Sequence, residues 1–361
     1  MKFKLSAVLA LISSTYAQVN VVEMAKELFP AAESHKHNHN EDHLVNLLVQ
    51  VKNQDGKHFA SKLAESVRVE RPGLKWMGIV AKHSKIKELE ENENIVGVDI
   101  DHEEHALETE FSVRRRLTET IPWGIPTVLQ DIDFWKNLDA PQSSISVCVV
   151  DTGYDLGHED LPSGADVDGT DGAGEAWSYD GNSHGTHCAG TIAALGNNDI
   201  GVTSVIPDNQ DGNFMLLIGK AFGANGSGYT SQTIAAVQGC VDQGANVISM
   251  SLGGSGSSRS SRNFYQDLYE NQNILLIAAA GNSGNSAYSY PASYNQVMSV
   301  ASLQERRSGA LQRSSFSQFN DQVEISAPGS SVLSTIPGNA YGYKVRFIIE
   351  KFCFFHHIPE Y

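Results

Sequence analysis

The sequence is poor in basic residues and in cysteine. Only 26 lysines and arginines stand against 42 aspartates and glutamates, so the 361 residues carry a formal net charge of −16 at pH 7. This balance argues against a nucleic acid as a partner and favours a soluble protein. The four cysteines do not make a disulfide scaffold in a chain of this length. Cys148 lies in an apolar strand and Cys188 in the segment that follows His187, so we expect both to be buried thiols and not members of disulfides. No apolar run is long enough to cross a bilayer, so we expect no membrane partner. We also expect the protein to be a monomer.

The first residues have the pattern of an export signal. Lys2 and Lys4 supply positive charge, residues 5–12 form a short apolar core, and residues 15–17 end in the small residue of a cleavage site. We therefore predict a signal peptide over residues 1–17 and a secreted protein.

A small α+β unit is predicted between residues 43 and 108. Its order of strand, helix, strand, helix, strand is typical of a compact open sandwich. The polar, histidine-rich stretch 18–42 precedes it and is interpreted as a solvated linker, although a metal site or a pH sensor has the same composition. The basic run Arg114–Arg116 follows it. The strands are expected at 44–51, 74–81 and 95–100, and the helices at 57–67 and 84–92.

From residue 145 onward, short apolar runs alternate with helical segments. Strands that are apolar throughout are typical of a parallel sheet covered on both faces. In such folds the ligand site lies beyond the carboxyl ends of the strands, where Asp151, Ser251 and Asn282 are found. The predicted strands are 145–150, 215–217, 246–250, 274–280, 297–301 and 323–326, and the clearest crossover helix is 230–243.

An aspartate at a strand end and a histidine at a helix start carry the clearest chemical signal. Asp151 follows the strand 145–150, and His184 opens the helical segment His-Gly-Thr-His-Cys-Ala-Gly. Such a pair supplies the orienting carboxylate and the general base of a serine-hydrolase triad, in the chain order Asp, His, Ser. His184 and His187 also have the spacing of a metal pair, but no glutamate lies between them as in the zinc-protease motif.

Both motifs together resemble the subtilase family of serine endopeptidases, and Cys188 directly after His187 resembles the proteinase K-like branch. The resemblance implies an α/β fold with a parallel-sheet, subtilisin-like catalytic domain, here incomplete, preceded by a small ferredoxin-like propeptide. It implies that His184 is the general base, that Asp151 fixes its tautomer, and that Asn282 donates its side-chain amide to the oxyanion. This chemistry requires no cofactor.

The resemblance also implies partners, which are peptide or protein substrates and the chain's own propeptide. Extended substrate backbone is expected to pair with one edge formed by Ser251, Leu252, Gly253 and Gly254 and with a facing edge that includes Tyr229. We expect the unit 42–108 to cover the first edge. The propeptide would span residues 18–117, with a cut near Leu117 or Thr118, and the peptidase domain residues 118–344.

A structural calcium ion is a further expectation from the resemblance. Asp160 matches a calcium ligand of many subtilases, and a nearby loop is one residue longer than the usual form. Glu119 stands where an amide is common. Carboxylate, amide and carbonyl oxygens suit a hard cation. The loop residues expected to contribute oxygens are Leu195, Asn198, Ile200 and Val202.

The resemblance ends near Lys344, before the segment that would carry the nucleophile. The family requires Gly-Thr-Ser-Met-Ala there, but no serine follows Ser334, and the tail 345–361 replaces that segment. Every valine codon begins with GU, as a splice donor does, so we hypothesise that Val345 opens a retained intron or, alternatively, a frameshift. The surroundings of Cys353 match no nucleophile, and we expect the chain as written to be inactive. The alternatives are a non-catalytic pseudoprotease and a propeptide-type inhibitor of subtilases.

Overall fold

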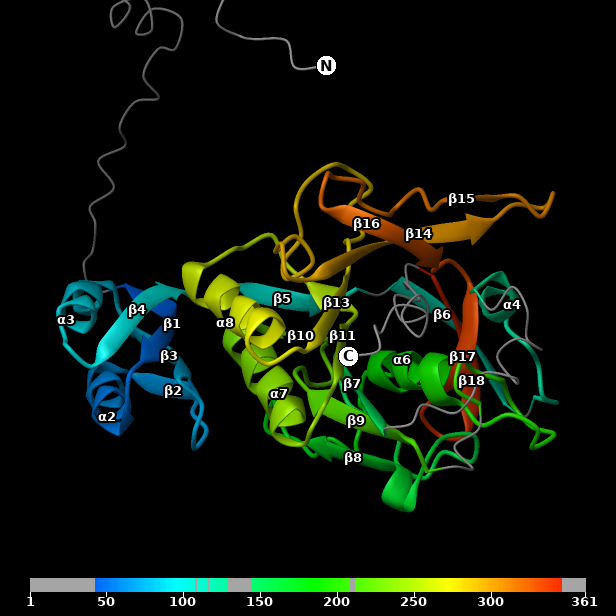
Figure 1. Cartoon of the computed structure of the whole chain (residues 1–361), viewed down its shortest axis with the longest axis horizontal. Coiled ribbons are helices and arrows are strands. Elements are labelled where there is room, and N and C mark those ends of the chain that lie inside the picture. The colour runs from blue at the N-terminus through cyan, green and yellow to red at the C-terminus, as the bar shows by residue number, and fades with distance from the viewer. Residues whose placement is uncertain (1–42, 108, 116, 129–143, 208–211, 346–361) are drawn as a thin grey trace, which may run out of the picture. The chain divides into compact units, whose positions relative to one another are not determined.

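A computed structural model describes residues 43–107, 109–115, 117–128, 144–207 and 212–345 (Figure 1). The predicted signal peptide, the histidine-rich stretch 18–42 and the tail with Cys353 lie outside the described residues. Among the helices of the described ranges, none has the length and apolar character to cross a membrane. A small α+β unit comes first along the chain, and a larger domain built on an eight-stranded sheet follows it.

The small unit is a four-stranded antiparallel sheet, in the strand order β2-β3-β1-β4, with two helices. Leu47 and Val49 face its own core, and Leu48 points to the opposite face, into a core shared with the larger domain. The observed order is β-α-β-β-α-β, one strand more than predicted. The additional strand, β2, is a four-residue edge strand, and the predicted helix 57–67 extended into its first two residues. The elements are β1 (Leu44–Val51), α2 (Gln54–Leu63), β2 (Ser66–Val69), β3 (Trp76–Lys82), the 3-10 turn η1 (His83–Lys85), α3 (Ile86–Glu90) and β4 (Ile95–Ile100).

The larger domain has the order β15-β14-β13-β11-β7-β9-β8, with β16 paired to β14. All pairings are parallel except that of β15 with β14, which confirms the predicted α/β class. Each of the six predicted strands is present, and the short strands β8 and β15 were not predicted. The strands are β7 (Ile145–Asp151), β8 (Val167–Thr170), β9 (Phe214–Lys220), β11 (Val247–Met250), β13 (Leu275–Ala279), β14 (Met298–Glu305), β15 (Leu311–Arg313) and β16 (Val323–Pro328).

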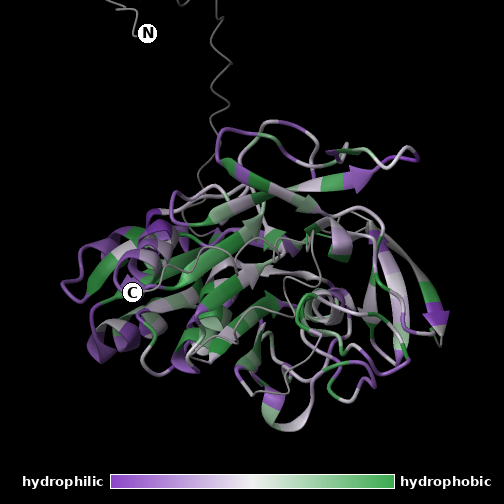
Figure 2. Ribbon diagram, turned by 45° about the vertical axis from the view of Figure 1, so that its right-hand side comes forward, coloured by the Kyte–Doolittle hydropathy of each residue, from purple (hydrophilic) through white to green (hydrophobic). Residues whose placement is uncertain are grey.

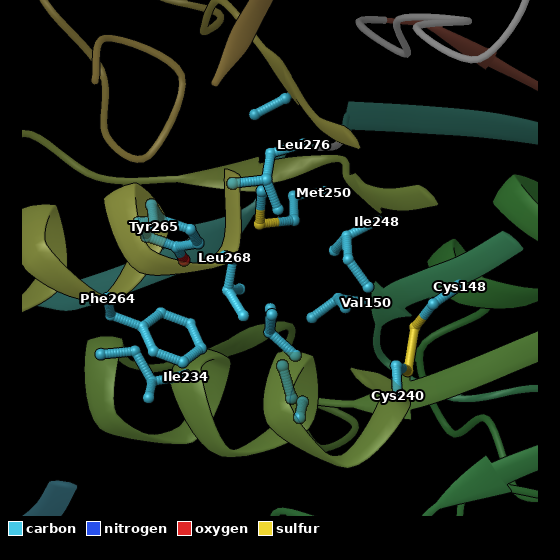
Figure 3. Close-up of a cluster of buried hydrophobic side chains, with 14 of the residues drawn as sticks. Cys148, Val150, Ile234, Cys240, Ile248, Met250, Phe264, Tyr265, Leu268 and Leu276 are labelled. Atoms are coloured by element: carbon cyan, nitrogen blue, oxygen red, sulfur yellow. A yellow bond between two sulfur atoms is a disulfide. The ribbon is translucent and has the colours of Figure 1, made fainter. Parts of the chain in front are cut away.

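Helices cover both faces of this sheet, as alternation along β7 shows. Val147 and Val149 pack into the core that includes residues of α6 (His184–Ala193). Cys148 and Val150 pack into the core formed with α7 (Thr230–Asp242) and α8 (Arg259–Glu270) (Figure 3). The central strands accordingly carry mostly hydrophobic residues (Figure 2). The remaining helical elements are α4 (Gly124–Val128) and the 3-10 turn η2 (Gly164–Asp166).

A disulfide joins Cys148 of β7 to Cys240 of α7 (Figure 3). The prediction that Cys148 is a buried thiol is therefore wrong. The strand alternation points Cys148 at α7, where Cys240 offers a Cα–Cα separation of 6.1 Å, a normal distance for a disulfide. Cys188, on the opposite face, is a buried free thiol as expected.

Two three-stranded sheets connect segments that are far apart in the chain. In the first, β5 (Glu103–Ala106) lies between β10 (Ser227–Tyr229) and β12 (Leu252–Gly253) and is antiparallel to both. In the second, β18 (Ala340–Val345) lies between β17 (Val332–Ile336) and β6 (Thr109–Arg115). Two residues of the basic run, Arg114 and Arg115, therefore belong to a paired strand.

Candidate active site

The structure brings the two predicted catalytic side chains together. Asp151 is the last residue of β7, and His184 is the first residue of α6. The Nδ1 atom of His184 lies 2.7 Å from Oδ1 and 2.9 Å from Oδ2 of Asp151, and both side chains are buried. These distances leave Nδ1–H as the donor to the carboxylate, so Nε2 is the ring nitrogen that can accept a proton from another group.

The carboxyl group of Asp151 is held in its ionised form. Burial by itself would raise its pKa, but the charge and hydrogen bond of His184 lower the pKa below its usual value. The N–H of Thr152 donates to Oδ1 at 2.7 Å, and the Cys188 thiol donates to Oδ2 at 3.2 Å, and both favour the carboxylate further. An ionised partner stabilises the imidazolium that a general base becomes during reaction.

Asp180 connects the strand that carries Asp151 to the helix that carries His184. One of its carboxylate oxygens accepts the hydroxyl of Thr152 at 2.9 Å and the N–H of Ser183 at 2.9 Å. The other accepts the N–H and the hydroxyl of Thr186 at 2.9 and 2.7 Å. A negative charge at this position also complements the positive end of the α6 dipole. Asp180 therefore fixes the start of α6 relative to the end of β7.

A close approach of α6 to the loop after β7 completes this arrangement. The N–H of Gly185 donates to the hydroxyl of Thr152 at 2.9 Å. A Cβ atom on Gly185 would lie 2.2 Å from the carbonyl oxygen of Gly153, so any larger residue would push the helix away. The glycine after His184 is therefore required by the short distance between imidazole and carboxylate.

Both predicted substrate-binding edges lie beside β5. Leu252 and Gly253 pair with Ala106 and His105, and Tyr229 pairs with Glu103. Ser251 accepts the N–H of Leu107 on its carbonyl at 3.1 Å. Gly254 forms a bridge with Tyr290, and a Cβ on it would lie 2.5 Å from the carbonyl oxygen of Glu103. The two edges thus flank the chain's own segment 103–107 on both sides, and the space between the edges is called the groove below.

Asn282 lies in the loop after β13 and is half-buried. The strands β7, β11 and β13 are adjacent and parallel, so Asp151, Ser251 and Asn282 follow their carboxyl ends at the same edge of the sheet. This is the edge at which ligands bind in open α/β sheets. The oxyanion role of Asn282 stays a prediction.

The predicted calcium ligands gather around the loop 195–202. The buried carboxylate of Asp160 accepts the side-chain amide of Asn198 at 2.8 Å and the N–H of Val202 at 2.9 Å. The carboxylate of Glu119 accepts the N–H of Asn197 at 2.7 Å from the same loop. Burial raises the pKa of Asp160 to about 6, and the charge of Glu119 adds to the increase.

A bound divalent cation would relieve the repulsion between these carboxylates, and the calcium site stays a prediction. The other two predicted ligands contact these residues through their backbone N–H groups. The N–H of Leu195 donates to the carbonyl oxygen of Asp160 at 3.1 Å, and the N–H of Ile200 donates to Oδ1 of Asn198 at 3.0 Å.

Two residues that shape the candidate site were missed by sequence reasoning. An aspartate shortly before a helix is a capping signal, so Asp180 could have been found from its place ahead of His184. Glu104 gave no such signal, because its partners Thr230 and Thr233 lie more than 120 residues away along the chain.

The model of the subtilase family matches residues 142–346, which is more than half of the chain. Subtilisin DY from Bacillus licheniformis is 36% identical over 229 residues, which cover 62% of this chain and 77% of that protein. The major intracellular serine protease of Bacillus subtilis is 36% identical over 231 residues, which cover 62% of this chain and 69% of that protein. The chain therefore belongs to the subtilase family of serine endopeptidases.

Two solved structures are similar to the described fold. A psychrophilic subtilisin-like protease from Pseudoalteromonas sp. AS-11 is 46% identical with a TM-score of 0.53, covering 60% of this chain and 48% of that one. Fervidolysin from Fervidobacterium pennivorans has a TM-score of 0.66 over 87% of this chain and 54% of that one, and at 24% identity it supports the fold alone. The chain thus spans about half the length of these two proteins.

Proposed function

We propose that this chain is the precursor of an exported, subtilisin-like serine endopeptidase of the proteinase K-like branch. The observation that carries the proposal is the buried pair of Asp151 and His184, with Nδ1 and Oδ1 2.7 Å apart at the carboxyl edge of a parallel sheet. Membership of the subtilase family and the position of Cys188 beside this pair support it.

In the proposed mechanism, His184 takes the proton of the attacking serine on Nε2 while Asp151 holds Nδ1–H. The ionised Asp151 stabilises the imidazolium, and the side-chain amide of Asn282 stabilises the oxyanion. Removal of one such amide donor in subtilisin is known to cost about 10²–10³ in kcat, and we expect a similar cost here.

The unit 42–108 acts in this proposal as a self-inhibiting propeptide. Its segment 103–107 pairs with both edges of the groove, so it excludes any other extended peptide while it is bound. Because the N–H of Leu107 donates to the carbonyl of Ser251, we propose that the bond after Leu107 is the one presented for cleavage. The alternative cut near Leu117 remains a prediction, and N-terminal sequencing of a processed enzyme distinguishes the two.

The nucleophile is proposed to come from sequence that the tail 345–361 replaces. In subtilisin itself, loss of the serine is known to lower kcat about 10⁶-fold, which corresponds to roughly 8 kcal/mol of activation free energy. We therefore expect the 361-residue form to be inactive. A retained intron that begins at Val345 accounts for the abrupt change. A pseudoprotease or a propeptide-type inhibitor is the alternative function for the form as written.

Genomic DNA and peptide hydrolysis together test the proposal. The DNA beyond the codon for Lys344 is expected to encode a Gly-Thr-Ser-Met-Ala-like segment after removal of an intron. The chain with that segment should hydrolyse peptides, and an Asp151→Asn variant of it should lose most of kcat because the imidazole tautomer is no longer fixed. A genomic sequence without a serine codon in this region would contradict the protease assignment and favour the inhibitor.

A further inference from the structure

The strand that occupies the groove has one deeply buried charged side chain. Glu103 and His105 of β5 are exposed, as expected for alternate residues of a strand, whereas Glu104 is only 4% exposed. A carboxyl group is almost never buried in this way unless hydrogen-bond partners compensate for the lost water. The protein around Glu104 must therefore supply such partners.

Two hydroxyl groups of α7 supply them. Thr230 Oγ1 donates to Oε1 of Glu104 at 2.8 Å, and Thr233 Oγ1 donates to Oε2 at 2.5 Å. Both threonines are almost completely buried and lie in the first turn of the helix, where the dipole also favours an acidic group. Each oxygen of the carboxyl group thus has its own donor.

Glu104 lies on the same face of β5 as Ala106, which packs against the apolar core cluster that includes Leu252, Ile234 and Tyr265. The surroundings of Glu104 are therefore largely apolar, with one further polar group. The hydroxyl of Tyr265, which is 1% exposed, has no hydrogen-bond partner among the described residues. Burial raises the pKa of Tyr265 well above its usual value, and the charge of Glu104 raises it further, which indicates that the two groups share one environment. The pocket therefore offers polar groups to a side chain that enters it from the groove.

We propose that Thr230 and Thr233 form a specificity pocket that selects a glutamate or glutamine side chain of the substrate. This side chain belongs to the third residue before the residue whose N–H donates to the Ser251 carbonyl. The two threonine hydroxyls would bind this side chain of a substrate peptide as they bind Glu104, which lies three residues before Leu107. This inference rests on the proposed function, because it names the substrates that the same groove prefers. An apolar side chain at this position would leave two buried hydroxyls without their acceptor.

The first test uses the full chain and its own strand. The amides of Ala106 and Leu107 donate to Gly226 and Ser251 across the groove, so their protection from hydrogen exchange reports on occupancy. Glu104→Leu should lower this protection about 10- to 100-fold, the cost of one or two unsatisfied buried hydroxyls. At pH 4.5, where the bound Glu104 carboxyl group is protonated, Glu104→Gln, which keeps an acceptor, and the exposed control Glu103→Leu should change this protection less than about threefold.

A second pair of variants separates specificity from a general loss of stability. In a chain with Thr230→Val and Thr233→Val, the preference should reverse. The amides of Ala106 and Leu107 should then be better protected with leucine at position 104 than with glutamate. The inference would be overturned if, with Thr230 and Thr233 unchanged, these amides were as well protected with leucine at position 104 as with glutamate.

The last test supplies the side chain on a separate peptide. In the full chain with Glu104→Lys, the strand is expected to leave the groove. A fluorescent peptide Glu-His-Ala-Leu should then bind at least about tenfold more tightly than Leu-His-Ala-Leu. Adding the two threonine-to-valine changes should abolish the difference.

Equal or reversed affinities would overturn the specificity pocket and leave the protease assignment intact. If neither peptide binds and no variant changes the exchange at Ala106 and Leu107, both the pocket and the substrate groove are contradicted.

Discussion

Occupancy of the groove by β5 should depend on pH through Glu104. Burial raises the pKa of this carboxyl group from 4.5 to about 7, against the hydrogen bonds of Thr230 and Thr233, and the charge of Asp101 raises it further. In the bound strand the Glu104 carboxyl group therefore keeps its proton up to about pH 7, whereas in the released strand it loses the proton near pH 4.5. The perturbation we consider is Glu104→Gln, which keeps the shape of the side chain but removes the titration.

The direction follows from proton linkage. Between pH 4.5 and about 7 the bound state carries more protons than the released state, so binding of the strand weakens as the pH rises. The stabilisation is fully present below pH 4.5 and is lost by about pH 7. A rise from 4.5 to about 7 at about 1.4 kcal/mol per pKa unit amounts to about 3–4 kcal/mol, or roughly a 300-fold change in the binding constant.

Other charged groups around Glu104 modify the size of this effect. Burial also raises the pKa of Asp101, although the hydrogen bonds of Ser231 and the charge of Arg68 oppose the increase. Tyr265 and Tyr294 have pKa values raised above the working range and stay neutral. We therefore expect Glu104→Gln to remove most of the pH dependence and Asp101 to leave a smaller slope of the same sign.

The assay is hydrogen exchange of the Ala106 and Leu107 amides between pH 4.5 and 8, expressed as protection relative to the free peptide at each pH. His102 and His105 are present in both proteins, so the comparison isolates position 104. Protection in the unchanged chain should fall by two orders of magnitude or more across this range, and in the variant it should stay nearly constant. An unchanged chain whose protection is flat, or rises with pH, would refute the reasoning.

Three further predictions concern stability. Asp180→Ala should lower the free energy of unfolding by about 2–4 kcal/mol in urea titrations and broaden the His184 ring signals in NMR spectra, because several buried donors lose their acceptor. Calcium at 100 times its dissociation constant should stabilise the fold by about 2.7 kcal/mol in thermal melts, with little gain in Asp160→Ala. Replacing Cys148 and Cys240 by alanine should destabilise the protein by about 4–5 kcal/mol, since the disulfide closes a loop with a sequence separation of 92 residues.

The sequence predicted those parts of the fold that rest on local pattern. The six apolar strands were found because strands buried on both faces leave continuous apolar runs. Asp151 and His184 were found because a strand end and a helix start are local features. The short strands β2, β8 and β15 were missed because they lie at sheet edges and bury little.

The remaining features depend on residues that only the folded chain brings together. Prediction of the disulfide would have required knowledge of the direction in which the Cys148 side chain points from β7 and of the position of Cys240 on α7. The pocket of Glu104 joins residues more than 120 positions apart. No local pattern carries such information.

Active-site labelling with a fluorophosphonate tests the central claim most directly. We compare the 361-residue chain with a chain in which the genomic serine-bearing segment replaces residues 345–361. The second chain should be labelled once its propeptide is released, and the 361-residue chain should remain unlabelled under the same conditions. Labelling of the 361-residue chain, or a serine-bearing chain that is released from its propeptide and still takes no label, would contradict the account.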